Sequence, residues 1–183
     1  MPVNMVQTIE TTDRVAVSEI LKCDKYIDVI IPRGGKSLIQ KISSESKIPV
    51  IKHLDGNCHV YIDKYADPKT AFNCTINSKT QRYGVCNAAE SLIVHKSFPK
   101  SHIAKILSEL DHHLVEIRGC KKIKSIFKKA HLAKESDWYE EYLRPVISVK
   151  IVNNIDEAIE HIEKYGSKHT DSIITTNKIS RDR

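Results

Sequence analysis

Short apolar runs alternate with longer segments of helical periodicity along most of this chain. Runs such as 58–62 and 146–152 are apolar or small at most positions, which is typical of strands buried on both faces of a parallel sheet. The segment 99–110 instead places Ile103 and Ile106 on one helical face. This alternation predicts an α/β fold with mostly parallel sheets.

Reading the chain in order gives the expected elements. Strands are expected over residues 26–31, 48–51, 58–62, 92–95, 114–117, 146–152 and 172–175. Helices are expected to start near residues 13, 37, 67, 99 and 154 and to end, where an end can be read, near 22, 110 and 165. Asp67 followed by Pro68 is a good helix start, because Asp caps the helix and Pro suits its first turn. The tail from Lys178 is expected to remain unpacked.

Length and composition bound the functional classes. The 183 residues are 40% hydrophobic and suit one good-sized domain or two small ones. The net charge of +6 favours anionic ligands such as phosphates, but no recognition motif indicates a nucleic-acid binder. The five Cys are odd in number and show no Cys-x-x-Cys pair, which indicates a reducing cytoplasm and gives a metal site no support. No apolar run is long enough to predict a membrane span.

The stretch 77–88 contains the strongest candidate for chemistry, Cys86. A nucleophilic Cys must reach the thiolate state, and Arg82 and backbone N–H groups are the local candidates that would favour it. Gly84 is expected to allow close backbone approach, and Asn87 with the alanines after it would leave room for a substrate. The alternative is a buried structural Cys between two elements, which is the commoner role of a free Cys.

Two further segments are candidates for binding anions. Arg33, Gly34 and Gly35 lie between an expected strand and an expected helix, where backbone N–H groups can bind an anion. A plain strand-to-helix turn explains the same residues equally well. The lysines of 121–129 are expected to form a solvated face rather than an anion site.

Several motifs in order resemble one family. They are IPRGG at 31–35, PVIKHLDG at 49–56, KTQR at 79–82, GVCNA at 84–88, EYL at 141–143 and GSKHTD at 166–171. Together they resemble γ-glutamyl phosphate reductase (glutamate-5-semialdehyde dehydrogenase), a proline-biosynthesis family within the aldehyde dehydrogenase superfamily. The resemblance runs along essentially the whole chain and implies an aldehyde dehydrogenase-like fold.

The resemblance implies an oxidoreductase that reduces γ-glutamyl phosphate with NADPH. Cys86 matches the nucleophile, which would form a thioester with release of phosphate. Its backbone N–H would help to stabilise the oxyanion. Glu141 matches the position that contacts the nicotinamide ribose, and residues 33–35 would lie near the cofactor or substrate phosphate.

His53, Arg82 and Asn87 are assigned to substrate binding or support by the same resemblance. His53 stands where oxidising aldehyde dehydrogenases have a Glu that activates water. An enzyme that passes its thioester to hydride gains by not activating water. A second departure is Tyr83, which stands beside the nucleophile where the family usually has Pro.

The resemblance also divides the chain. Residues 1–56 are expected to be the C-terminal part of an NADP-binding domain, and 57–183 a catalytic domain that is truncated at its C-terminal end. The chain would then be an internal piece of a longer family chain. The expected partners are a small-molecule substrate, further copies of the chain and glutamate 5-kinase, with no nucleic acid or membrane. The alternative function is an inactive remnant or interaction module of the same fold.

Overall fold

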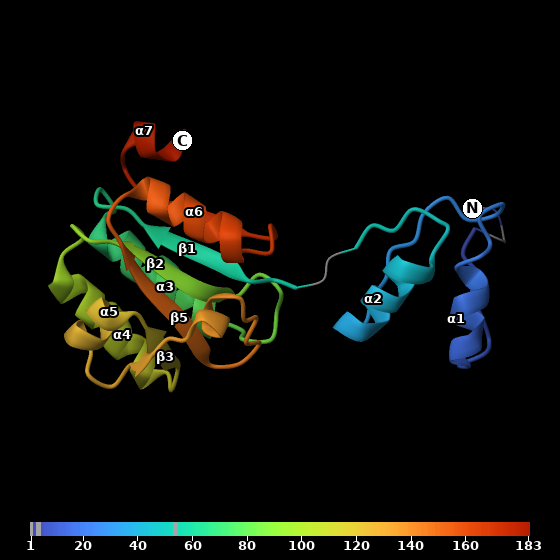
Figure 1. The fold of residues 1–183 in the computed structure, drawn as a ribbon, viewed down its shortest axis with the longest axis horizontal. Coiled ribbons are helices and arrows are strands. Elements are labelled where there is room, and N and C mark those ends of the chain that lie inside the picture. Colours follow the sequence, from blue (N-terminus) through green and yellow to red (C-terminus); the bar gives the residue numbers. More distant parts are fainter. Residues whose placement is uncertain (1, 3–4, 53–54) are drawn as a thin grey trace. The chain divides into compact units, whose positions relative to one another are not determined.

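A computed structural model describes residues 2, 5–52 and 55–183 of the chain. The chain forms two compact units, residues 1–54 and 55–183, and each is described here by itself. Figure 1 shows the elements of both units. The assignment of residues 1–56 to a cofactor-binding domain and of 57–183 to a catalytic domain stays a prediction.

The second unit is built on one parallel sheet. Within residues 55–183, the sheet has six strands in the order β4-β3-β5-β2-β1-β6, and every neighbouring pair is parallel. The strands are β1 (Cys58–Ile62), β2 (Ala89–His95), β3 (Glu116–Gly119), β4 (His131–Leu132), β5 (Val146–Val152) and β6 (Asp171–Ile174). The predicted α/β fold with parallel strands is therefore confirmed. The expected bounds of β1 and β5 agree with the structure, whereas the two-residue strand β4 was not predicted.

Helices cover both faces of this sheet (Figure 1). The helices of this unit are α3 (Pro68–Thr80), α4 (Lys100–His112), α5 (Lys121–Ile126), the 3-10 helix η1 (Glu135–Trp138), α6 (Ile155–Tyr165) and α7 (Lys178–Arg181). The larger core lies between the sheet and α3, α4 and α5, and the smaller core lies between the sheet and α6. Among the described residues, no helix is long and apolar enough to cross a bilayer.

The two cores explain why the central strands are apolar on both faces. All residues of β1 and of β2 are buried. Alternate residues of β1 enter different cores, because Val60 packs in the larger cluster and Tyr61 in the smaller one. The helix starts follow the predicted capping chemistry, since the Asp67 side chain accepts a bond from the Thr70 N–H at 2.8 Å.

Two predictions for this unit were wrong. The strand expected over 114–117 begins instead at Glu116, because Leu114 adopts a left-handed turn conformation with φ of 58° after α4. The tail is not unpacked, because it forms the short helix α7. The Asn177 side chain caps α7, and Arg183 makes an ion pair of 2.6 Å with Asp156.

The first unit contains α1 (Arg14–Ile20) and α2 (Lys36–Glu45). Asp13 caps α1, as expected. The strand predicted over 26–31 is wrong, because in the described part of this unit the run makes only an isolated parallel bridge, between Ile30 and Val50. Ile31 is 69% exposed. A continuous apolar run becomes a buried strand only where neighbouring strands and helices cover it.

Candidate active site

The candidate site lies at the amino ends of four neighbouring strands. Residues 55–57 precede β1, residues 81–88 precede β2, residues 139–145 precede β5 and residues 166–170 precede β6. Because these strands are parallel neighbours in the order β5-β2-β1-β6, their preceding segments meet at one edge of the sheet. Ligands of open parallel sheets usually bind at the carboxyl ends of the strands. The candidate site of this chain lies instead at the amino ends.

Cys86 lies in the loop 81–88, between the end of α3 and the start of β2. Its side chain is exposed, so the alternative of a buried structural Cys does not hold. Arg82 and Asn87, on the same loop, are also exposed. The backbone reverses after Val85, whose carbonyl accepts a bond from the Ala88 N–H at 3.0 Å. The loop therefore presents its thiol to solvent from a hydrogen-bonded turn.

Two expectations about this loop are corrected. Gly84 has no positive φ, and a Cβ placed on it would meet nothing within 4 Å, so its geometry does not require glycine. Ala88 and Ala89 are each 2% exposed, because they enter the core at the start of β2. Room over the sulfur therefore does not come from these two alanines.

The glycine that the site does require is Gly56. A Cβ at this position would lie 1.8 Å from the Cys86 carbonyl oxygen, a backbone atom that cannot move aside cheaply. The Gly56 N–H donates to Glu141 Oε1 at 2.7 Å. One small residue thus joins the segments before β1, β2 and β5. In the sequence Gly56 stands out only as the last residue of the motif at 49–56, and no local pattern predicts its contact with Cys86.

Cys58, at the start of β1, is hydrogen-bonded to the Cys86 loop. Its Sγ donates to the Cys86 carbonyl oxygen at 3.1 Å, and it lies 3.8 Å from His169 Nδ1. The Cys58 side chain is buried, and this burial raises the pKa of its thiol to about 11. The thiol therefore stays protonated at neutral pH and acts as a donor, while Cys86 remains the accessible sulfur.

A buried ion pair joins the two chain segments that flank the loop 81–88. Lys79, in the last turn of α3, donates to Glu90 Oε2 of β2 at 2.5 Å, and the two side chains are 0% and 1% exposed. The other oxygen of Glu90 accepts from the Leu143 N–H at 3.1 Å. The Glu90 carboxylate thus fixes both ends of the loop and the segment that contains Glu141. No role for this pair was predicted from the sequence.

In this pair, each charge opposes the pKa shift that burial causes in the other group. Burial raises the pKa of the Glu90 carboxyl, and the nearby Lys79 ammonium opposes that rise. Burial likewise lowers the pKa of the Lys79 ammonium, and Glu90 opposes that change. Each side chain can remain charged in the core only because the other is present.

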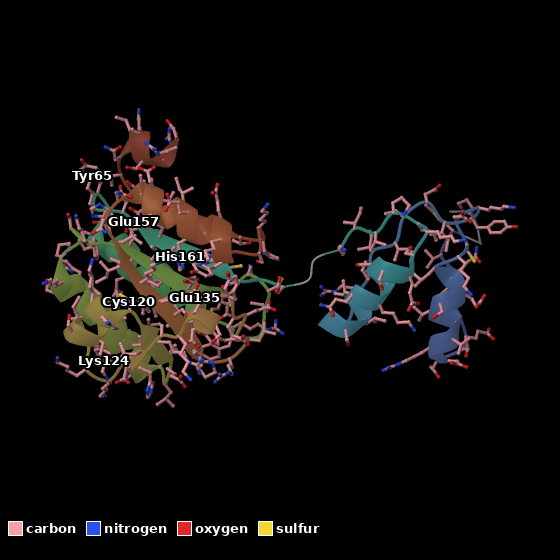
Figure 2. The ribbon with its side chains drawn as sticks, in the orientation of Figure 1. Tyr65, Cys120, Lys124, Glu135, Glu157 and His161 are labelled. Carbon is pink, nitrogen blue, oxygen red and sulfur yellow. The ribbon has the colours of Figure 1, made fainter. Side chains whose placement is uncertain are left out.

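Further buried polar groups hold the same edge of the sheet on the α6 side. The Asn57 amide donates to the carbonyl oxygens of Trp138 at 2.8 Å and of Tyr165 at 2.9 Å. His161 on α6 lies over the sheet (Figure 2), and its Nδ1 is 2.9 Å from the Lys150 ammonium. Burial, and secondarily Lys150, lower the pKa of His161 to about 3, so this imidazole is neutral at physiological pH.

The remaining predicted residues lie outside the unit 55–183 that contains this site. Arg33, Gly34 and Gly35 belong to the first unit, where Gly35 precedes α2 in an extended conformation with φ of −69°. That geometry fits an ordinary turn into a helix, and their role as an anion site stays a prediction. His53 lies outside the described residues.

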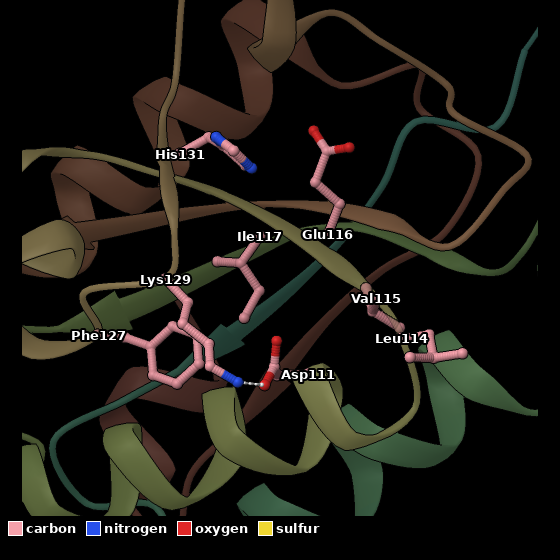
Figure 3. A pocket seen from close by; sticks show the side chains of 8 residues that line it. All are labelled: Asp111, Leu114, Val115, Glu116, Ile117, Phe127, Lys129 and His131. Atoms are coloured by element: carbon pink, nitrogen blue, oxygen red, sulfur yellow. Dashed lines mark hydrogen bonds and ion pairs between the residues drawn. The ribbon is translucent and has the colours of Figure 1, made fainter.

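A pocket of about 280 Å³ lies elsewhere, beside β3 and the end of α4 (Figure 3). It is lined by Asp111, Leu114, Val115, Glu116, Ile117, Phe127, Lys129 and His131. An ion pair of 2.6 Å between Lys129 and Asp111 crosses it. None of the residues around Cys86 contributes to it, so we do not assign the site's chemistry to this pocket.

The fold is aldehyde dehydrogenase-like. No protein-family model matches the chain. A structure of glyceraldehyde-3-phosphate dehydrogenase from Methanocaldococcus jannaschii, complexed with NADP, matches 86% of the chain with a TM-score of 0.63. The match covers 43% of that structure, and the identity is 14%, so this comparison concerns the fold alone.

More specifically, the chain resembles γ-glutamyl phosphate reductases. The structure of this enzyme from Thermotoga maritima is 45% identical over 95% of the chain, with a TM-score of 0.91. The enzyme from Saccharomyces cerevisiae is 34% identical over 99% of the chain, with a TM-score of 0.53. The chain spans only 42% and 44% of the length of these two proteins.

Proposed function

We propose that this chain carries the catalytic-cysteine part of an NADPH-dependent acyl-phosphate reductase, with γ-glutamyl phosphate as the substrate and glutamate 5-semialdehyde as the product. The observation that carries the proposal is the exposed Cys86, held by Gly56 and Cys58 at the edge that also contains Glu141. The similarity to two γ-glutamyl phosphate reductases supports the choice of substrate.

The chemistry begins at the Cys86 sulfur. The thiolate attacks the acyl carbon, a C–S bond forms, and the C–O bond to phosphate breaks with its electron pair on the departing phosphate. The Cys86 backbone N–H is the proposed donor to the oxyanion of this step. Cys58 and Gly56 fix the Cys86 carbonyl group and so hold the sulfur-bearing backbone in place. Conversion of the thioester to the aldehyde then returns the sulfur as thiolate.

The residues present fit a nicotinamide cofactor at one position. NADPH, when bound, supplies the hydride for reduction of the thioester. Glu141 Oε1 is bound by the Gly56 N–H, and the half-buried carboxylate retains a second oxygen that can accept from ribose hydroxyls. We assign the ribose contact to Glu141 and the phosphate contacts to Arg33, Gly34 and Gly35. Arg82 and Asn87, exposed beside Cys86, are the proposed substrate contacts, with His53 as a supporting residue.

The proposal is tested by trapping the acyl group. Purified chain is incubated with γ-glutamyl phosphate, made in place from ATP and glutamate by a glutamate 5-kinase, and its peptides are then analysed by mass spectrometry. We expect a γ-glutamyl adduct on Cys86 that hydroxylamine removes and that Cys86→Ala abolishes. The matched control is Cys74→Ala, because Cys74 is also exposed but lies on α3. An adduct that survives Cys86→Ala would contradict the assignment.

A second candidate function is an inactive interaction module of the same fold. The chain spans 42% of the Thermotoga maritima protein, so the similarity concerns that part of the enzyme. Acylation of Cys86 separates the two functions, because an inactive module would form no adduct. In an assay of NADP⁺ reduction with glutamate semialdehyde and phosphate we expect no turnover by the isolated chain, because turnover also requires a positioned hydride donor, and that positioning contributes roughly 7–11 kcal/mol. Self-association and contact with glutamate 5-kinase are further proposals that size measurements of the mixture would test.

A further inference from the structure

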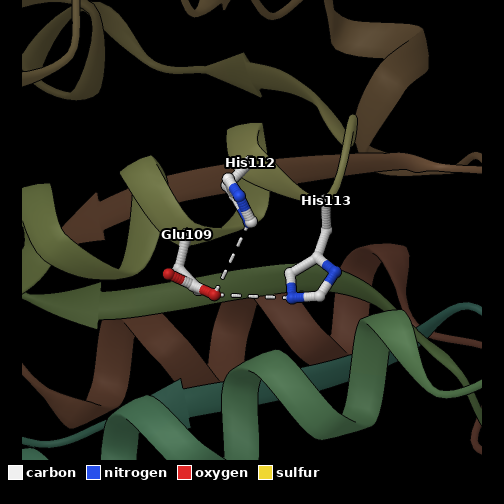
Figure 4. Close-up of side chains that lie close together, drawn as sticks. All are labelled: Glu109, His112 and His113. Carbon is white, nitrogen blue, oxygen red and sulfur yellow. Dashed lines mark ion pairs between the residues drawn. The ribbon is translucent and has the colours of Figure 1, made fainter.

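A cluster of potential metal ligands lies at the C-terminal end of α4, outside the Cys86 site. It consists of Glu109, His112 and His113 (Figure 4). One carboxylate oxygen and two imidazole nitrogens lie within 4.8 Å of one another. None of the three residues lines the pocket beside β3. Among the described residues, this is the group of three His, Cys, Asp or Glu side chains that converges closely enough to hold one ion.

The distances are close to those that a single ion requires. Glu109 Oε1 is 3.5 Å from His113 Nε2 and 4.0 Å from His112 Nδ1. Ligands about 2.0–2.2 Å from a tetrahedral zinc ion lie roughly 3.3–3.5 Å apart. The Glu109–His113 pair therefore already has a chelating separation. The three ligand atoms lie within 4.8 Å of one another, so His112 has to rotate to complete the site, which its 80% exposed side chain allows.

The arrangement follows from helix geometry. Positions i, i+3 and i+4 lie on one helical face, so residues 109, 112 and 113 are neighbours whenever α4 forms. They also occupy the helix end where the macrodipole is negative and favours a cation. The site is therefore preformed by the secondary structure rather than by long-range packing.

The nearby lysines are directed elsewhere. Lys105, one turn before Glu109, places its ammonium 5.1 Å from the centre of the Phe72 ring. Lys129 pairs with Asp111 at 2.6 Å. The interactions of Glu109 are with the two imidazoles, and a metal ion would replace those weak pairs by stronger bonds.

We propose that Glu109, His112 and His113 form a surface binding site for a divalent transition metal ion. Two imidazoles and one carboxylate suit Zn²⁺, Ni²⁺ or Cu²⁺ and do not suit Ca²⁺ or Mg²⁺, which prefer oxygen ligands. The exposed position leaves further coordination positions for water or for a ligand from another molecule. The inference does not depend on the reductase proposal, because none of the three residues takes part in that chemistry.

The site also adjoins the Cys86 loop. The Tyr83 hydroxyl donates to the His113 carbonyl oxygen at 3.4 Å, and Tyr83 lies three positions before Cys86 in the chain. The backbone of one ligand is thus in contact with the loop that carries the proposed nucleophile. A bound ion would restrain the His113 side chain, whose backbone contacts this loop.

Isothermal titration calorimetry with Zn²⁺ tests the proposal on the full chain. The thiols are first blocked with N-ethylmaleimide, because the exposed Cys74 and Cys86 would otherwise bind zinc as thiolates. We expect one equivalent of Zn²⁺ to bind. Loss of a residue that only supports a metal ligand weakens binding roughly 10–100-fold. Because Glu109 and His113 are proposed as ligands themselves, Glu109→Gln and His113→Asn should each weaken Zn²⁺ binding at least that much. The matched controls are His102→Asn, on the same helix, and His131→Asn, on β4, which should bind as the parent does.

Electron paramagnetic resonance with Cu²⁺ gives an independent reading of the ligands. The parent chain should show hyperfine coupling to two nitrogens, and His112→Asn should reduce it to one. Calcium should not compete with Zn²⁺ at equal concentration. The proposal is overturned if the variant that lacks all three side chains binds Zn²⁺ with the parent's stoichiometry and affinity, or if the Cu²⁺ spectrum shows no coupled nitrogen.

Discussion

The amino ends of the central strands and the lysine segment 121–129 use charged and polar side chains in different ways. At the amino ends, buried groups join segments that are distant in the chain, as Asn57 does with Trp138. In the lysine segment, most ammonium groups lie in solvent, as predicted, and the side-chain bonds of Ser125 and Lys124 reach only local carbonyls. The difference teaches that the number of charges in a segment says little about their structural role, which depends on burial and on the separation of the partners.

Two lysines of the segment depart from this description, because Lys129 pairs with Asp111 of α4 at 2.6 Å and Lys124 is only partly exposed. The Lys124 ammonium donates to the carbonyl oxygens of Lys128 and Ala130, each at 2.6 Å, and its side chain is half-buried. Figure 2 shows it on the α5 side of the second unit. The prediction of a solvated face is therefore wrong for Lys124, which instead closes the turn that follows α5.

The largest effect is expected from Lys79→Met. This change leaves the Glu90 carboxylate buried without its partner, and breaking a buried pair from one side costs about 3–5 kcal/mol of unfolding free energy. Urea denaturation of the purified chain measures it. The double variant Lys79→Met with Glu90→Leu removes both charges and should recover most of the loss. If the single variant lost less than the double one, the ion pair would not be what holds the loop.

The buried histidine of α6 is expected to make stability depend on pH. The pKa of His161 is about 3 in the folded chain and near 6.5 when unfolded, so the unfolded state binds more protons in between. The neutral His161 therefore costs no stability above pH 6.5. As the pH falls below 6.5, the free energy of unfolding decreases by roughly 1.4 kcal/mol per pH unit. Denaturation midpoints between pH 7 and 5 should fall more steeply for the parent chain than for His161→Gln.

The matched control for that experiment is His102→Gln, which changes a histidine on α4 that is not in the buried network. Its stability should follow the parent's pH dependence. Parallel slopes for the parent and His161→Gln would contradict the assignment of the acid sensitivity to His161.

Lys124→Met is expected to have an intermediate effect. The change removes two charge-assisted hydrogen bonds but keeps the aliphatic stem, and partial exposure reduces the loss to about 1 kcal/mol. The control is Lys128→Met, because Lys128 is exposed and in the same segment. Equal denaturation midpoints for the two variants would show that the hydrogen bonds of Lys124 do not stabilise the fold.

The smallest effect is expected from Lys121→Glu combined with Lys122→Glu. Both side chains are exposed, and surface charges contribute little to stability. The denaturation midpoint should stay within its measurement error, while solubility changes with salt concentration. A loss of stability comparable to that of Lys124→Met would show that these side chains are packed.

The sequence predicted the elements of the second unit well, because their patterns match their surroundings. The run 58–62 is buried at every position and the run 146–152 at five of seven, as their apolar composition indicates. The run 26–31 has a similar composition, but it makes only an isolated bridge and remains exposed. Local composition cannot report whether neighbouring strands and helices cover a run.

The site was predictable only in part for a related reason. Cys86 and Glu141 were found from motifs, because their types and order resemble a known family. Gly56, Cys58 and Glu90 matter through contacts with residues up to 85 positions away, which no local pattern records. Gly84 shows the opposite error, since it stands beside the nucleophile but meets no neighbour that requires glycine.

The central claim is that Cys86 is the thiol that the fold holds ready for chemistry. Sub-stoichiometric iodoacetamide, followed by mass spectrometry of the peptides, tests it most directly. Cys74 is the decisive comparison, because both thiols are exposed and simple access would label them equally. The account predicts that Cys86 is labelled first and that the buried Cys58 is labelled last. Labelling of Cys74, Cys58 or Cys120 ahead of Cys86 would contradict it.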